Sequence, residues 1–191
     1  MRYAVLVVAL AICGCTTSPP LPEDTKSITT LTVAQAEALA KREGKLVLRG
    51  LTTLSSSVAD ALAKHDGGLI LNGLTTLSDE AAAALARHEG GLSLNGLTGL
   101  SDGAAEALAK HSRGVALNGL TTLSENGAKA LAKHTNSLLL NGLTTLSDEA
   151  AGVLAKHEGK LGLNGLTTLS AEAAAALRAN PDVQLPEAFR R

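Results

Sequence analysis

Aromatic side chains are almost missing from this 191-residue chain, in which Tyr3 and Phe189 are the only two and tryptophan is absent. Single-stranded nucleic acids and many sugars are bound by stacking on aromatic faces, so the chain lacks the surfaces that these ligands need. An excess of one charge is missing too, because 17 Lys and Arg stand against 18 Asp and Glu, for a net charge of −1. Without a basic patch, we expect no nucleic acid partner.

Cysteine is nearly as scarce, with Cys13 and Cys15 as the only two. The N-terminus carries an early positive charge at Arg2 and then an apolar run over 4–12, shorter than the roughly 20 residues that span a bilayer. This pattern is typical of a secretory signal peptide. Because no cysteine follows residue 15, the mature chain has no disulfide framework in which Cys15 could serve.

The stretch Ile12-Cys13-Gly14-Cys15 resembles the bacterial lipobox. The resemblance implies that Cys15 is diacylated and becomes the mature N-terminus after cleavage at Gly14. It also implies sorting to the outer membrane, facing the periplasm or the cell surface, if the cell has one, since Thr16 rather than Asp follows the cysteine. The alternative is an ordinary cleaved signal with an incidental cysteine. The stretch that follows, up to residue 27, contains three prolines and predicts an extended tether.

From residue 46 the chain repeats itself every 23 residues. The octet LNGLTTLS stands unchanged at 71–78, 117–124, 140–147 and 163–170, and with one substitution at 48–55 and 94–101. A period of this length is the signature of a solenoid, in which one unit cannot fold alone and is stabilised by its neighbours. The sequence therefore predicts a stacked array.

Each unit predicts one strand, one turn and one helix. The alternation of Leu69 and Leu71 indicates a short strand with one buried face. The Asn-Gly that follows indicates a turn, because both residues tolerate left-handed backbone angles. Ser78 is a typical N-cap for a helix over about 79–88 that ends at a left-handed Gly90.

The fixed positions of the helix define its buried face. Ala82, Leu85 and Ala86 recur at i, i+3 and i+4 in the units and form one stripe. One position between them varies freely, which predicts exposure to solvent: Asp60, Ala83, Glu106, Lys129 and Gly152.

The series L-x-L-x-x-L-x-x-L-S-D over 69–79, with Leu85-Ala86 on the helix, resembles the leucine-rich repeat, especially its cysteine-containing subtype. The match covers 28–185, although the unit is shorter than usual and leucine replaces the cysteine. The resemblance implies an α/β right-handed solenoid of horseshoe shape. Short parallel strands would line the concave side, helices the convex side, and the concave face would bind protein.

We therefore expect four segments along the chain. They are a signal peptide at 1–14, Cys15 with the tether at 15–27, the solenoid at 28–179 and a C-terminal cap at 180–191.

Both ends of the array are expected to be covered. The first helix, over 32–43, lacks a complete strand before it, so residues 24–31 with the tether should cover that edge. At the other end, Val183 and Leu185 predict a last strand one residue early in phase. Pro186 should blunt its open edge, and Phe189 should cover exposed core.

The candidate binding surface is the outward side of the strands with the column that follows it. It is small, mildly apolar and nearly uncharged, and its residues are Val47, Arg49, Ile70, Asn72, Ser93, Asn95, Ala116, Asn118, Leu139, Asn141, Gly162 and Asn164. The asparagines either satisfy backbone groups of the turns from repeat to repeat or present amides to a ligand.

Five histidines recur in register: His65, His88, His111, His134 and His157. A metal site or a pH switch needs converging rings, whereas packed helices lie about 10 Å apart. We therefore expect a cation at the C-terminus of each helix and no metal.

Serine, aspartate and histidine also recur in every unit without forming a hydrolytic triad. Ser78 and His88 mark opposite ends of the predicted helix, about 15 Å apart, which is beyond hydrogen-bond reach. The serines should be helix caps. Because GxSxG, GxxxxGK and HExxH motifs are absent from the sequence, we expect no enzyme and no cofactor.

Together these observations predict a lipid-anchored protein of a bacterial cell envelope with a non-catalytic protein-interaction solenoid. The partner would be another protein on the concave face, and the membrane would be reached through the lipid. The alternative is a structural spacer or a self-associating scaffold without a specific ligand. The scarcity of Trp, Tyr and Arg, the usual residues of binding hot spots, favours that alternative.

Overall fold

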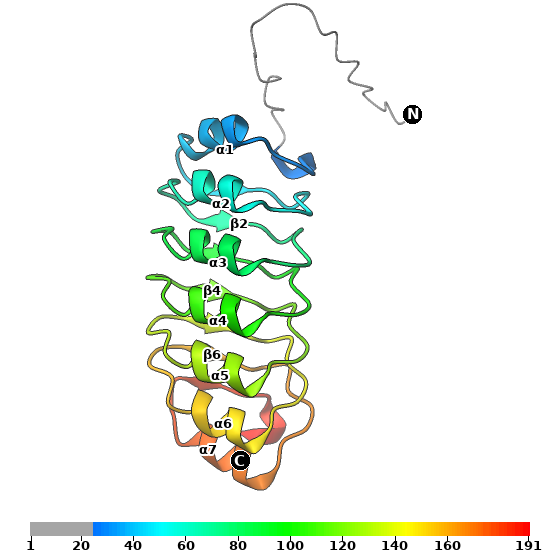
Figure 1. The fold of residues 1–191 in the computed structure, drawn as a ribbon. Coiled ribbons are helices and arrows are strands. Elements are labelled where there is room, and N and C mark those ends of the chain that lie inside the picture. Colours follow the sequence, from blue (N-terminus) through cyan, green and yellow to red (C-terminus); the bar gives the residue numbers. More distant parts are fainter. Residues whose placement is uncertain (1–24) are drawn as a thin grey trace, which may run out of the picture.

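The computed structural model describes residues 25–191, so the predicted signal peptide, Cys15 and most of the predicted tether lie outside the described residues. Seven strands alternate with seven helices and pair in chain order into one parallel sheet. Figure 1 shows the repeats stacked in chain order into a column, with the helices in single file. The α/β class and the repeat arrangement predicted from the sequence period are confirmed.

The elements are short and regular. The helices are α1 Val33–Ala40, α2 Ser56–Leu62, α3 Asp79–Leu85, α4 Asp102–Leu108, α5 Glu125–Leu131, α6 Asp148–Leu154 and α7 Ala171–Arg178. The strands are β1 Leu46–Val47, β2 Leu69–Ile70, β3 Leu92–Ser93, β4 Val115–Ala116, β5 Leu138–Leu139, β6 Leu161–Gly162 and β7 Val183–Gln184. Two 3₁₀ helices, η1 Thr25–Ser27 and η2 Glu187–Phe189, lie at the two ends.

The register of the sheet follows the sequence repeat. Leu46 pairs with Leu69, and Leu69 pairs with Leu92, so equivalent positions of successive repeats are neighbours. The last pairing joins Leu161 to Val183, one residue early, as the sequence predicts.

The helices begin where predicted but end earlier. The Ser78 side chain accepts a hydrogen bond from the Ala81 N–H and caps α3. The helix then stops at Leu85 rather than near residue 88, because the His88 N–H donates to the Leu85 carbonyl in an i→i−3 bond. This tighter turn directs the chain toward the next strand.

The core consists of leucine columns and the buried side of the helices. Leu71 and Leu74 beneath the strands are fully buried, and so are Ala82 and Leu85 on α3. The freely varying column is exposed at its first four members and half-buried at Gly152, so the helix face was predicted correctly. Ala86 is the exception, since it is only half-buried.

The predicted turn at Asn72-Gly73 is confirmed, but the prediction of a left-handed Gly90 is wrong. Among the described glycines, only Gly44 and Gly159 have a positive φ. Instead, a Cβ at Gly73 would lie 2.2 Å from the Arg49 carbonyl oxygen, and one at Gly90 would lie 2.1 Å from the Gly67 carbonyl oxygen. Glycine is required there because the backbones of stacked repeats approach closely.

The N-terminal edge of the array is covered, as predicted. Thr25 Oγ1 donates a 2.8 Å hydrogen bond to the Val47 carbonyl oxygen, and Ile28 is buried. The last three residues of the predicted tether thus form η1 against β1 and are not extended.

The C-terminal edge also carries a cap. The helix α7 ends at Arg178, and Phe189 packs half-buried against the core, as the sequence predicts for Phe189.

Candidate functional site

Parallel pairing brings the outward residues of the strands into one continuous row. Val47 lies beside Ile70, and each further pairing adds the next repeat, through to Gly162 beside Gln184. Most of these side chains are half-buried, whereas Gly162 is buried. The sheet therefore brings together the strand residues that the sequence singled out.

A shallow depression of about 410 Å³ lies on this face. Ile70, Ala116 and Leu139 supply apolar side chains, and Gly68, Gly91 and Gly114 leave the floor open beside them. Lys45 at one end is the only charged residue that lines it. We call this surface the strand face. Its small apolar residues can bury apolar groups of a partner, but few of them can fix its orientation by hydrogen bonds.

The asparagines beside the strand face form a ladder of hydrogen bonds that runs along the stack. Asn72 Oδ1 accepts from the Asn95 N–H at 3.0 Å, and Asn95 Oδ1 accepts from the Asn118 N–H at 2.9 Å. In the same way, Asn118 Oδ1 accepts from the Asn141 N–H, and Asn141 Oδ1 accepts from the Asn164 N–H. Of the two possibilities that the sequence left open, this geometry supports satisfaction of turn backbone groups.

The start of this column differs from its interior. Arg49 occupies the asparagine position of the first repeat, and its side chain is exposed. Ser93 Oγ donates to Asn72 Oδ1 at 2.8 Å and accepts from Asn95 Nδ2 at 3.0 Å, so it adds a branch to the ladder.

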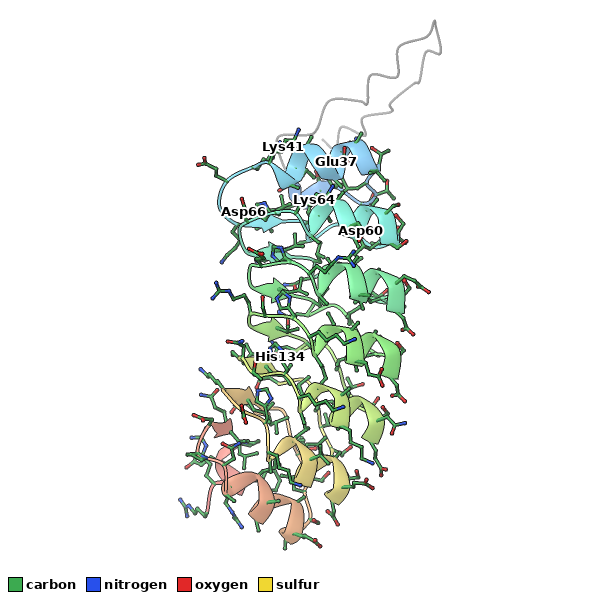
Figure 2. All side chains as sticks on the ribbon, turned by 60° about the vertical axis from the view of Figure 1, so that its left-hand side comes forward. Glu37, Lys41, Asp60, Lys64, Asp66 and His134 are labelled. Carbon is green, nitrogen blue, oxygen red and sulfur yellow. The ribbon has the colours of Figure 1, made fainter. Side chains whose placement is uncertain are left out.

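The histidines lie elsewhere than expected. The sequence predicted cations at the ends of the helices, but all five side chains are buried, with exposed fractions of 0–2%. They lie in the turns that lead from each helix to the next strand. Figure 2 shows His134 within the stack, whereas Lys64 and Asp66 point outward.

The imidazole rings stack in three neighbouring pairs. The centroids of His65 and His88 are 6.3 Å apart, and those of His88 and His111, like those of His134 and His157, are 6.1 Å apart. Burial lowers the pKa of His88, His111 and His134, although backbone carbonyls partly oppose this effect. The prediction of charged helix ends is therefore wrong. The helices end before the histidines, and the repeat spacing at the rings is much shorter than the expected separation between helices.

The serines are helix caps, as predicted. Besides capping α5, Ser124 Oγ donates to Asp102 Oδ1 of the preceding repeat, and this bond lowers the pKa of Asp102. Ser101 bonds Asp79 in the same manner. The recurrent Ser-Asp pair therefore links neighbouring helix starts.

A second hollow of about 490 Å³ lies near the N-terminal end of the stack. Glu37 and Lys41 on one repeat face Lys64 and Asp66 on the next (Figure 2). The charges are mixed and balanced, and no sequence pattern had indicated this hollow.

Within residues 25–191, no group of three or more His, Cys, Asp or Glu side chains could hold a metal ion. Over the same range, every helix is too short or too polar to cross a membrane. Comparison of the chain with protein-family models and with curated proteins finds no match.

Proposed function

We propose that this chain is a lipid-anchored protein of a bacterial cell envelope whose solenoid binds another protein on its strand face, without catalysis. The observation that carries the binding role is the apolar depression, which runs across several repeats and is free of charge except at Lys45. Interfaces concentrate binding energy in such desolvated centres. The lipobox-like Ile12–Cys15 sequence carries the anchoring role.

The proposed solenoid is right-handed, with the strand face on its concave side. Connections from a strand through a helix to a parallel neighbour are right-handed in about 98% of cases. The resemblance to leucine-rich repeats supports the same arrangement.

The scaffold alternative has an observation in its favour. Of the residue types that dominate binding hot spots, the strand face and its asparagine column contain Arg49 alone. Because η1 lies against the first strand, self-association would have to use the sides of the column rather than its N-terminal end.

The binding role is tested by cross-linking in the intact envelope followed by identification of the adducts. Glu substitutions at Ile70 and Leu139 would charge the depression, and Ala83→Glu on the exposed helix column is the matched control. We expect adducts to a foreign protein that disappear in Ile70→Glu/Leu139→Glu and persist in Ala83→Glu. Adducts between copies of this chain alone would support the scaffold instead.

The anchoring role is tested by labelling cells with a radioactive fatty acid and fractionating the envelope. Cys15→Ala should abolish the label, because it removes the residue that would be acylated. The chain should then remain an uncut precursor or be released, because stable anchoring needs more than one acyl chain. Cys13→Ala should behave as the natural protein. Label retained in Cys15→Ala would contradict the assignment.

A further inference from the structure

The histidine column is the largest set of buried titratable groups in residues 25–191, and the proposed function makes no use of it. Each ring lies beside one or more backbone carbonyl oxygens of the preceding repeat. His65 shows this most clearly, with Nδ1 3.2 Å from the Ala40 oxygen and Nε2 2.8 Å from the Gly44 oxygen. The Nε2 of His111 is 3.0 Å from the Gly90 oxygen, and that of His157 is 2.9 Å from the Asn136 oxygen.

A neutral imidazole cannot satisfy this arrangement in full, because it has one N–H to donate and a lone pair on its other nitrogen. In addition, six buried ring nitrogens have no hydrogen-bond partner: both of His88, both of His134, and Nδ1 of His111 and His157. A second proton would supply the missing donor. It would also place a positive charge in a site closed to water, about 6 Å from the next ring.

Backbone carbonyls compensate such a charge only in part, and no negatively charged side chain contributes to the pKa of these three rings. The charges that act on the pKa of His88, His111 and His134 are those of neighbouring histidines, and each of these lowers the pKa further. The other charged side chains on the turns around the column are all exposed to solvent: Lys41, Arg42, Glu43, Lys45, Lys64, Asp66, Arg87, Glu89, Lys110, Arg113, Lys133, Lys156, Glu158, Lys160 and Asp182.

We propose that the histidine column is an acid-sensitive element of the fold. In mild acid, protons enter adjacent stacked rings, the resulting imidazolium ions repel one another, and the turns of neighbouring repeats separate along this edge. The opposite edge of these repeats, which carries the asparagine ladder, has no group that titrates in mild acid. We call it the asparagine edge, and it stays closed. The solenoid therefore loosens along one edge as the pH falls.

The direction of the pH dependence follows from the lowered pKa values. His88, His111 and His134 have folded pKa values below 6.5, their ordinary value. The unfolded chain therefore binds more protons than the folded chain below that pH. Their contribution to stability is complete above about pH 6.5 and is lost as the pH falls toward the folded values.

The chain contains its own control residue at the end of the column. Asn180 occupies the histidine position of the seventh repeat, and its Nδ2 donates to the Ala155 and His157 oxygens, both at 2.9 Å. One amide thus serves two carbonyls of the preceding repeat without titrating. Asparagine is consequently the matched substitution for the buried histidines.

The test is the free energy of unfolding of the full chain, measured by denaturant titration between pH 7.5 and 5.5. Each of the three histidines raises the unfolding equilibrium constant by up to about tenfold per pH unit below 6.5. For the three histidines together, the unfolding equilibrium constant of the natural protein should therefore rise by up to about a thousandfold per pH unit. The variant His88→Asn/His111→Asn/His134→Asn should lose most of this dependence. An equal dependence in both proteins would overturn the proposal.

A second measurement does not require the variant to fold. NMR titration of the imidazole Cε1 protons in the natural protein gives each pKa directly. The three central rings should titrate below pH 6.5, and new exchange broadening should be confined to the turns that hold them. Titration at or above 6.5, or a protonated column with unchanged turns, would overturn the proposal.

Discussion

The asparagine ladder and the histidine column flank the same strands, one after each strand and the other before it. Both link neighbouring repeats through side chains that bond to backbone groups. The side-chain oxygen of Asn118 accepts from the backbone N–H of Asn141, and the backbone N–H of Asn118 donates to Asn95 Oδ1; neither group titrates. A neutral imidazole that faces two carbonyls, as His65 does, has one N–H and cannot donate to both. Neighbouring repeats are therefore linked by pH-independent hydrogen bonds at one edge and by titratable side chains at the other.

The largest expected effect comes from the core that both edges share. Leu108 is 1% exposed in the middle of the array, and Leu108→Asp would bury an unpaired charge there. We expect the free energy of unfolding to fall by more than about 4 kcal/mol and the cooperative thermal transition to disappear. Circular dichroism measures both. On the exposed side of the same helix, Glu106→Gln should change stability by less than about 0.5 kcal/mol. Equal losses would mean that the assigned helix face is wrong.

The next effect isolates the asparagine edge. Asn118→Leu keeps the size of the side chain but removes the acceptor for both the N–H and Nδ2 of Asn141. Leaving these groups unpaired should lower the free energy of unfolding by about 1–3 kcal/mol. The decrease should be the same at pH 7.5 and pH 5.5. The control is Asn164→Leu at the end of the ladder, which should cost less. A cost for Asn118→Leu that grows in acid would contradict a pH-independent edge.

A smaller effect isolates the histidine edge. His111→Asn should change stability at pH 7.5 by less than about 1 kcal/mol, since the amide can donate to the Ala86 and His88 oxygens, the equivalents of those that Asn180 bonds. At pH 5.5 the variant should gain up to about 1.4 kcal/mol relative to the natural protein, the value of one pKa unit. Denaturant titrations at the two pH values measure the difference. A gap between the two proteins that does not change with pH would contradict the prediction.

The smallest effect lies on the exposed helix side, away from both edges. Arg87 pairs with Asp60 of the preceding repeat, and their side chains are 66% and 50% exposed. Because solvent screens such pairs, Arg87→Gln should cost less than about 1 kcal/mol, measured in the same titrations. The cost should not depend on pH between 7.5 and 5.5. A cost as large as that of Asn118→Leu would show that surface pairs, not the two edges, link the repeats.

The sequence predicted the features that depend on repeat position. Parallel pairing of equivalent leucines follows from the 23-residue repeat, and the buried face of α3 follows from the helical spacing of Ala82 and Leu85. The early phase of β7 was visible because Val183 comes one residue sooner than its equivalents. In each case, a residue type that recurs at the same position of the repeat has the same surroundings in every repeat.

The histidines carried the same signal, but it was interpreted by local rules. His88 recurs in every central unit while its neighbours Arg87 and Glu89 vary in charge or type, which by the same logic indicates a buried position. The error came from treating the histidine as a charged helix end. Residue 88 lies i+3 from the buried Leu85, and although α3 stops at Leu85, the following turn buries the ring. Turn geometry of this kind depends on the neighbouring repeat and is not encoded in one unit.

Hydrogen exchange resolved by residue tests the difference between the two edges most directly. The Leu92 and Val115 amides donate across the strands next to the histidine turns, whereas the Asn118 and Asn141 amides belong to the asparagine ladder. Between pH 7.5 and 5.5, protection factors corrected for intrinsic exchange should fall at least about tenfold more for the first pair than for the second. An equal fall at both edges, or no fall at either, would contradict an acid-sensitive edge opposite a pH-independent one.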